Sequence, residues 1–547
     1  MVIVSCVPSG CSTVRVLRLA GTAHSEAAQR SKRERNNIFF KDIEQQYQVF
    51  NLQIYAKGLN IASTGIDYSS VLRNFASINN KFMELPVPFE DSMRQLLGGE
   101  YPTFREALLG EPAVSIRLNK SKCTATPDYE RIPWATNGYY LPERPAFTFD
   151  PWLHAGCYYV QEASSMFVEQ ALRQHLGQAR VALDLCAAPG GKSTLLRSLL
   201  PDDCVLVSNE VMRSRAQVLA ENITKWGHPR CIVTSNYPAD FTPLGETFDL
   251  ILVDAPCSGE GMFRKDEMAV TEWNPENVEV CWKRQRDILT DIWPTLRPGG
   301  LLIYSTCTFN TQEDEENVRW MMDELGAELL PISIDDSWGI TPSLVPDVPH
   351  AYRFLPGRTR GEGFFLAIVR KGEDVPVTEE HRGGKTKKRD KKGKQPALTV
   401  PSECKGWLAN NKAYTYKIIG TEVMALPTDM EPLYTTLSEQ LYLIKAGITL
   451  AALKGRDALP AHDLGMSTAL SAEAFARCEL PYTEALHYLR REAITLPADT
   501  PRGFVLVTYR NAPLGFVKNL GNRANNLYPN EWRIRSGHLP EEDVHVV

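Results

Sequence analysis

Two cysteines stand where apolar, strand-like stretches end, and a thiol in such a place can act as a nucleophile. Cys257 follows the run at 250–253, and Cys307 follows the run at 301–304. A lone cysteine at a strand end is most often a small hydrophobe of the core. Two of them at equivalent places are more informative, because both thiols face one pocket if their strands are neighbours. The hypothesis is covalent catalysis by a thiolate.

A glycine-rich turn lies ahead of both cysteines in the chain. The segment Cys186-Ala-Ala-Pro-Gly-Gly-Lys192 follows an apolar strand and precedes a helical stretch, so its glycines allow a ligand to approach the backbone and the helix offers free N–H groups. A phosphate-binding P-loop would need glycine where Cys186 stands, and Pro189 lacks one of the N–H groups that such a loop uses. The sequence therefore disfavours an ATPase. Glu210 follows the next strand, where an acid usually bonds ribose hydroxyls.

The elements that position these residues alternate between short apolar runs and helical stretches of roughly 10–20 residues. The runs are partly β-branched and lie at 181–185, 205–208, 231–234, 250–253 and 301–304. This alternation predicts a parallel, doubly wound α/β sheet whose ligand binds at the carboxyl ends of the strands. Residues 364–369 are expected to close the sheet as a late edge strand, and 112–122 to form a strand that ends in basic residues.

A pair of thiols beside a nucleotide-type pocket suits methylation of cytosine at C5. This carbon is a poor nucleophile, and addition of a thiolate to C6 makes it reactive toward a methyl sulfonium. An acid near N3 stabilises the activated ring, and Asp254 is the natural choice for it. After transfer the C5 proton must leave and the thiol must be expelled, which a second thiol or a base assists. Spacing alone leaves open which of Cys257 and Cys307 attacks.

Taken together, the motifs resemble the Nol–Nop–Sun family of RNA cytosine-C5 methyltransferases, over about residues 83–371. The segments that carry the resemblance are Cys186-Ala-Ala-Pro-Gly-Gly-Lys192, Asp254-Ala-Pro-Cys257-Ser-Gly, Tyr304-Ser-Thr-Cys307-Thr, Arg117-Leu-Asn119, Tyr158-Tyr-Val-Gln-Glu-Ala-Ser-Ser-Met166, Glu313-Asp-Glu315 and Gly361-Glu-Gly-Phe-Phe-Leu-Ala367. The resemblance implies a Rossmann-like, S-adenosylmethionine-dependent methyltransferase core. It also implies that Cys307 is the nucleophile and that Cys257 aids product release. The residues that it implies for cofactor contact are Cys186, Ala187, Ala188, Pro189, Gly190, Gly191, Lys192, Glu210 and Asp254.

The sequence departs from the family after the third strand. Members commonly carry an Asn-Asp pair there, whereas this chain has Asn236-Tyr237, with Asp240 three residues on. Two alternatives remain open, namely that Tyr237 stacks on the adenine of the cofactor or that Asn236 bonds it.

The domain organisation follows from shifts in composition. We expect a low-order extension at 1–82, a small α+β RNA-contacting segment at 83–160, the methyltransferase domain at 161–371, a basic flexible linker at 372–400 and a C-terminal region at 401–547. In the linker, seven of the ten residues at 385–394 are Lys or Arg. The stretch at 515–534 resembles the PUA-like region of the family's bacterial 16S ribosomal RNA methyltransferases. Its polar and aromatic residues suit RNA contact, and the alternative is a polar loop around a Trp/Tyr core anchor.

Composition limits the function classes and the compartment. The net charge of −6 gives the chain no overall positive field that would indicate a nucleic-acid partner, so RNA binding would depend on local basic patches. Twelve cysteines without a C-x-x-C pair predict no metal site and a reducing cytoplasm, and no apolar run is long enough to span a membrane. We expect a monomer that methylates RNA, with 16S rRNA or the small ribosomal subunit favoured. The alternatives are a tRNA methyltransferase and an inactive RNA-binding assembly factor.

Overall fold

The computed structural model describes residues 84–373, 399–455 and 457–547. The expected low-order extension at 1–82 and most of the basic linker at 372–400 lie outside these residues. Among the described residues, no helix is long and apolar enough to cross a membrane.

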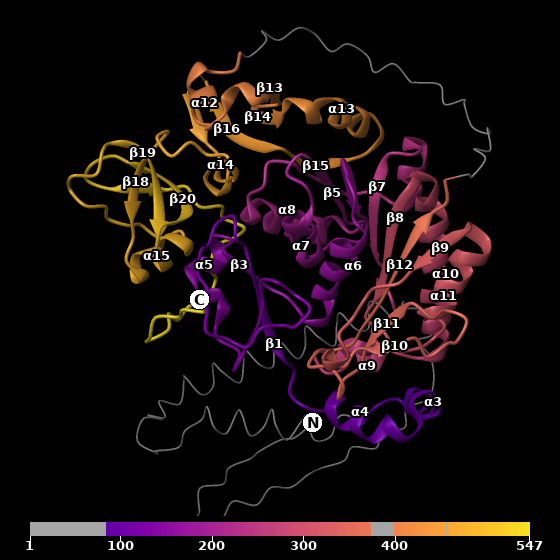
Figure 1. Ribbon diagram of the computed structural model, residues 1–547. Helices are drawn as coiled ribbons and strands as arrows, with labels where there is room; N and C mark the ends of the chain where they lie inside the picture. Colours follow the sequence, from indigo (N-terminus) through magenta and orange to yellow (C-terminus); the bar gives the residue numbers. More distant parts are fainter. Residues whose placement is uncertain (1–83, 374–398, 456) are drawn as a thin grey trace, which may run out of the picture. The chain divides into compact units, whose positions relative to one another are not determined.

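A ten-stranded mixed sheet forms the centre of the described chain (Figure 1). Its strands are β4 (Val181–Asp184), β5 (Val205–Asn209), β6 (Cys231–Thr234), β7 (Phe248–Asp254), β8 (Leu296–Thr306), β9 (Ala327–Leu330), β10 (Thr341–Pro342), β11 (Ala351–Phe354), β12 (Phe364–Lys371) and β15 (Leu443–Ala446). The order is β10-β11-β12-β8-β7-β4-β5-β6-β15, with β9 paired to β12. The five central strands β8-β7-β4-β5-β6 are parallel, which confirms the predicted doubly wound sheet.

The two faces of the sheet are apolar because its strands are buried on both sides. In β7, Leu250 and Leu252 pack into one core, whereas Ile251 and Val253 pack into the other. The first face is covered by α6 (Val168–His175), α7 (Gly191–Leu199) and α8 (Arg213–Trp226). The second is covered by α10 (Pro275–Ile292), α11 (Glu315–Leu325) and α13 (Glu431–Gln440). The alternation of side chains along a strand sends neighbouring residues to opposite layers.

Two features of the sheet differ from the sequence-based expectation. The predicted edge strand at 364–369 is internal, because β12 pairs with β8 on one side and with β11 and β9 on the other. The opposite edge is extended by β15, which lies about 200 residues beyond β6 and pairs antiparallel with it. Both differences arise from long-range pairing that local patterns do not encode.

The N-terminal described segment contributes two helices and a small sheet. These are α3 (Val87–Leu97), α4 (Tyr101–Leu108), β1 (Val114–Leu118), β2 (Gly138–Leu141) and β3 (Tyr158–Val160). Arg117, on β1, is buried and joins this sheet to the start of α7, since its guanidinium donates to Gln161 Oε1 at 2.8 Å and to Thr194 Oγ1 at 2.6 Å. The segment is thereby attached to the glycine-rich turn.

The C-terminal region contains two further sheets besides β15. One has the order β13-β14-β16-β17, with β13 (Tyr414–Ile419), β14 (Glu422–Pro427), β16 (Ile448–Lys454) and β17 (Asp457–Pro460). The other has the order β18-β19-β20-β21, with β18 (Ala476–Glu479), β19 (Gly503–Tyr509), β20 (Ala512–Asn519) and β21 (Ala524–Asn526). Tyr528 is buried in this second part, so within 515–534 it is a core anchor, as the alternative interpretation of that stretch expected.

Candidate active site

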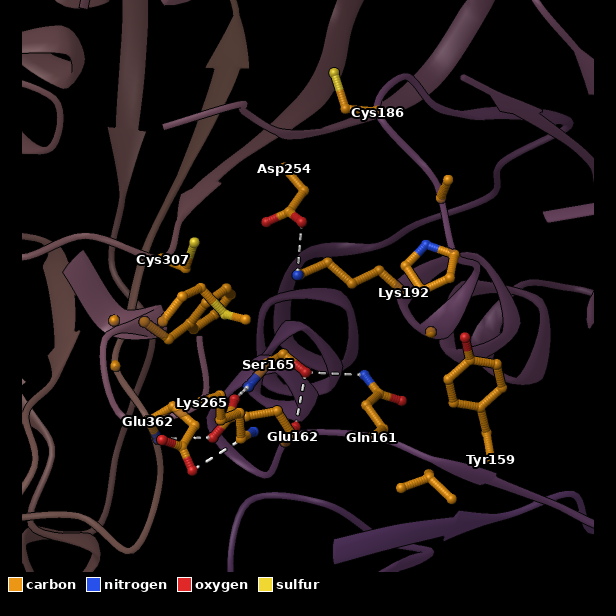
Figure 2. Close-up of a pocket in the computed structure, with 18 of the residues that line it drawn as sticks. Tyr159, Gln161, Glu162, Ser165, Cys186, Lys192, Asp254, Lys265, Cys307 and Glu362 are labelled. Carbon is orange, nitrogen blue, oxygen red and sulfur yellow. Dashed lines mark hydrogen bonds and ion pairs between the residues drawn. The ribbon is translucent and has the colours of Figure 1, made fainter. Parts of the chain in front are cut away.

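A cavity of about 350 Å³ opens at the carboxyl ends of the central strands. Its walls come from five segments: the glycine-rich turn, the end of β7 with the loop after it, the end of β8, the start of β12 and the N-terminal segment around β3. Figure 2 shows Cys307, Asp254, Lys192 and Cys186 toward one end of this cavity and Glu162, Ser165, Lys265 and Glu362 toward the other. The two cysteine-bearing loops and the predicted cofactor turn therefore converge, as the strand order requires.

The two thiols are in contact. β7 and β8 are neighbours in the sheet, and Sγ of Cys257 lies 3.1 Å from Sγ of Cys307. The S–H···S hydrogen bond with Cys307, together with burial, raises the pKa of Cys257 well above that of an ordinary thiol. The raised pKa favours the protonated form of Cys257. Cys307 lines the cavity, whereas Cys257 is not among the lining residues.

Two buried glutamates fix the cysteine loops to one another. Glu260, after Cys257, accepts hydrogen bonds from the backbone N–H groups of Phe309 and Asn310 at 2.7 and 3.0 Å. Glu313, after Cys307, accepts from the Ser258 N–H at 3.0 Å and from Asn310 at 2.8 Å. Burial raises the pKa of Glu313, although these hydrogen bonds oppose the shift. The crossed hydrogen bonds hold the two thiols in register.

Lys192 and Asp254 form an ion pair in the cavity wall. Their Nζ and Oδ2 atoms are 2.8 Å apart, and the other carboxylate oxygen accepts a hydrogen bond from Ser305 Oγ at 2.8 Å. Burial lowers the pKa of Lys192, but the charge of Asp254 and the hydrogen bond to it, with smaller contributions from neighbouring groups, together outweigh burial, so the pKa is raised. Lys192 therefore carries a proton and a positive charge beside Cys307 in the cavity.

The glycine-rich turn is built to leave its backbone accessible. Gly190 has φ +118°, a left-handed conformation that side chains rarely adopt, and it caps the start of α7. A Cβ on Gly191 would meet the Tyr159 ring at 3.3 Å, on the cavity wall. Of the residues assigned to cofactor contact from the sequence, those that line the cavity are Cys186, Ala187, Ala188, Pro189, Gly191, Lys192 and Asp254.

Glu210 lies beyond this cavity, at the end of β5. Its carboxylate accepts the Met212 N–H at 2.9 Å and is 3.1 Å from Arg215 Nη1. Its side chain is only 6% exposed, so it is a fixed acceptor beside the turn.

Asn236 and Tyr237, the two candidates for contact with the adenine, differ in their surroundings. The Asn236 amide is occupied, because its Oδ1 accepts the Tyr442 N–H at 2.8 Å and its Nδ2 donates to the Tyr442 carbonyl at 3.1 Å. Asn236 thus fastens the chain just before β15 to the end of β6, and its possible role in bonding the adenine stays a prediction. Tyr237 is 68% exposed and stays a candidate.

Several cavity residues had no assigned role in the sequence. Tyr159 lies on β3 and Gln161, Glu162 and Ser165 follow it, whereas Glu362 and Gly363 precede β12 and Phe364 begins it. Both stretches belong to the motifs that carried the family resemblance, which was the signal that they face the site. Lys265 lies three residues after η6 (Glu260–Met262) and lacked such a signal.

The chain matches three models of known families. Residues 170–370 match the model described as 16S rRNA methyltransferase RsmB/F. Residues 85–163 match the N-terminal domain of 16S rRNA methyltransferase RsmF, and 475–534 match the Methyltransferase RsmF PUA domain.

Individual relatives and structures are also similar to the chain. Ribosomal RNA small subunit methyltransferase F of Enterobacter sp. (strain 638) is 31% identical over 421 residues, which cover 75% of this chain and 85% of the relative. The protein of the same name from Aliivibrio fischeri (strain MJ11) is 32% identical over 75% of this chain and 87% of its own length. Among solved structures, a methyltransferase homolog protein from Pyrococcus horikoshii is 28% identical over 51% of this chain and 93% of that one, with a TM-score of 0.45.

Proposed function

Because the chain belongs to the 16S rRNA methyltransferase RsmB/F family, we propose that it methylates C5 of a cytosine in 16S rRNA, with S-adenosylmethionine as the cofactor. The observation that carries the C5 chemistry is the contact of Cys257 with Cys307 at 3.1 Å, beside a cavity and a glycine-rich turn. Methylation at a heteroatom would need no thiol pair, whereas C5 alkylation needs a nucleophile that adds and later leaves.

The residues of the turn fit S-adenosylmethionine. The backbone of the turn opens onto the cavity, and Gly191 leaves room that a Cβ would fill. Cys186 to Lys192 would hold the methionine part beside Asp254, and Glu210 would accept hydrogen bonds from the ribose. The cofactor supplies an electrophilic methyl group.

Cys307 is the nucleophile of this proposal. It lines the cavity, and the S–H of Cys257 is in hydrogen-bonding distance of its sulfur. The Cys307 thiolate donates an electron pair to C6 of the cytosine, a C6–S bond forms, and the electrons of the C5–C6 double bond shift toward C5 and N3. The nucleophilic carbon is then C5.

Lys192 and Asp254 divide the work of stabilising this ring. The negative charge that develops at the N3 and O2 side needs a donor, and in the ion pair the proton is on Lys192. The carboxylate of Asp254 can accept from the exocyclic amino group, which uracil lacks. The assignment of the acid to Asp254 from the sequence stays a prediction, and the ion pair favours Lys192 in that role.

Cys257 acts in product release. Once C5 carries the methyl group, transfer of the C5 proton to a solvent base restores the double bond and breaks the C6–S bond, so Cys307 departs as a thiolate. The Cys257 S–H can donate to this departing thiolate from 3.1 Å, and the raised pKa of Cys257 keeps that proton in place.

The test uses two cysteine variants of the full chain and a 16S rRNA substrate. Cys307→Ala is expected to abolish methylation that bisulfite sequencing detects, because no nucleophile remains. Cys257→Ala is expected to accumulate a denaturant-stable RNA–protein adduct, seen as a shifted band on a denaturing gel, because release slows. Cys281→Ala is the matched control, since Cys281 is buried on α10 and does not line the cavity.

Two results would contradict the proposal. Full methylation by Cys307→Ala would show that Cys307 is not needed as a nucleophile, which contradicts the covalent mechanism. Loss of a tRNA mark with 16S rRNA unchanged, in a strain that lacks the gene, would replace the substrate.

A further inference from the structure

The ammonium group of Lys265 lies at the edge of the active-site cavity. Lys265 lies in the loop between η6 and α9 (Glu267–Glu272), its side chain lines the cavity, and 32% of that side chain is exposed. Its Nζ is 3.5 Å from Glu362 Oε1, too far for a good hydrogen bond. Within 84–373, 399–455 and 457–547, Glu362 is its only ion-pair partner, and that oxygen has no hydrogen-bond partner.

The other charged side chains at this end of the cavity already have hydrogen-bond partners. The Glu362 carboxylate accepts from Arg264 Nε at 2.7 Å, and that arginine is anchored further by two backbone carbonyls. Glu162 accepts from three backbone N–H groups, those of Ser164, Ser165 and Glu362. At the other end, Lys192 is paired with Asp254 at 2.8 Å. Lys265 is therefore the cavity-lining cation whose charge is least compensated.

A groove of about 570 Å³ adjoins the cavity at this point. The boundary between cavity and groove falls twice between consecutive residues. Lys265 and Glu362 line the cavity, and their neighbours Arg264 and Gly361 line the groove. The chain is closely packed at this boundary, because a Cβ on Gly361 would meet Ser164 Oγ at 2.0 Å. Two exposed arginines, Arg144 and Arg360, also line the groove, together with Glu111 and Glu143, and Arg360 is paired with Glu130 at 2.6 Å. A strand that places one base in the cavity would pass Lys265 on its way to this groove.

We propose that Lys265 binds a backbone phosphate of the RNA strand at the mouth of the cavity, beside the base that enters it. A phosphodiester is the anion that every nucleotide brings, and an ammonium with free donors can form charge-assisted hydrogen bonds with it. The Glu362 carboxylate is shared between two cations, because Arg264 binds its Oε2 at 2.7 Å while Lys265 lies 3.5 Å from its Oε1 and keeps donors for another anion. The inference rests on the proposed RNA substrate, and it assigns an RNA contact outside the thiol chemistry.

The test measures the salt dependence of RNA binding by the full chain. Filter binding of a 16S rRNA transcript at a series of KCl concentrations gives the slope of log K against log [KCl]. Loss of one phosphate contact is expected to reduce this slope by about 0.7 to 1 in Lys265→Gln and to weaken binding roughly tenfold at low salt. Lys265→Arg is expected to restore most of the affinity. In steady-state methylation, KM for RNA rises while kcat stays within about twofold.

Lys283→Gln is the matched control, because Lys283 is an exposed lysine paired with Glu279 at 2.6 Å on α10, and it lines no part of the cavity. S-adenosylmethionine binding by calorimetry is expected to be equal in all variants. An unchanged salt slope in Lys265→Gln, an equal effect in Lys283→Gln, or a wild-type chain that binds no RNA would overturn the proposal. Failure of the cysteine mechanism would leave the salt slope intact, so the two failures are distinguishable.

Discussion

Substitution Asn236→Ala tests whether this side chain serves the fold or the cofactor. Both hydrogen-bonding groups of its amide are used by the backbone of Tyr442, at 2.8 and 3.1 Å, and the residue is 8% exposed. Each such bond contributes about 1 kcal/mol net. This net value already includes the exchange of bonds with water, so for two bonds we expect β15 to open about 2 kcal/mol more easily.

Hydrogen exchange measures this local free energy directly. A loss of about 2 kcal/mol corresponds to roughly 30-fold faster exchange of the amides of β15, with little change in β4 and β7. Affinity for S-adenosylmethionine is expected to change less than about threefold. Asn526→Ala is the matched control, because the Asn526 amide on β21 also bonds only backbone groups: it donates to the carbonyls of Tyr488 and Glu492 and accepts the Tyr528 N–H. The reasoning is refuted if β15 exchanges as before while cofactor affinity falls tenfold or more.

Two further predictions follow from burial and from close packing. Burial raises the pKa of Asp184 to about 7, so the folded chain keeps a proton that the unfolded chain releases, and its contribution to stability declines as pH rises from about 4 to 7. Between pH 5 and 7 the free energy of unfolding is therefore expected to fall less steeply in Asp184→Asn than in the unchanged chain, by about 1.4 kcal/mol per pH unit. Denaturant titrations that give the same slope for both proteins would contradict this. Gly361→Ala places a Cβ 2.0 Å from Ser164 Oγ, so we expect a lower melting temperature and a methylation rate reduced at least tenfold. Gly372→Ala is the control, because its Cβ would have no atom within 4 Å, and both quantities should stay unchanged.

The order in which the two cysteines act shows how sequence and structure divide the evidence. Strand-end placement made both Cys257 and Cys307 candidates, but no spacing rule separates attack from release. Family resemblance supplied the order. In the structure Cys307 lines the cavity whereas Cys257 does not, and the order of attack and release stays a prediction.

The sequence by itself determined the parts that depend on local pattern. The apolar runs predicted the central parallel strands, because a strand buried on both faces must be apolar throughout. The glycine-rich turn was readable because only glycine allows close approach and a left-handed backbone at positions such as Gly190. Carboxyl ends of parallel strands meet at one edge, so the convergence of Cys257, Cys307 and Asp254 was predictable too.

Only the tertiary structure decided the contacts between residues far apart in the chain. The pairing of β15 with β6, the internal place of β12 and the use of the Asn236 amide by Tyr442 all join distant segments. A hydrogen bond or an ion pair depends on distances of about 3 Å, and composition and periodicity do not specify these. For the same reason the least compensated cation of the cavity, Lys265, emerged only once the partners of every neighbouring charge were known.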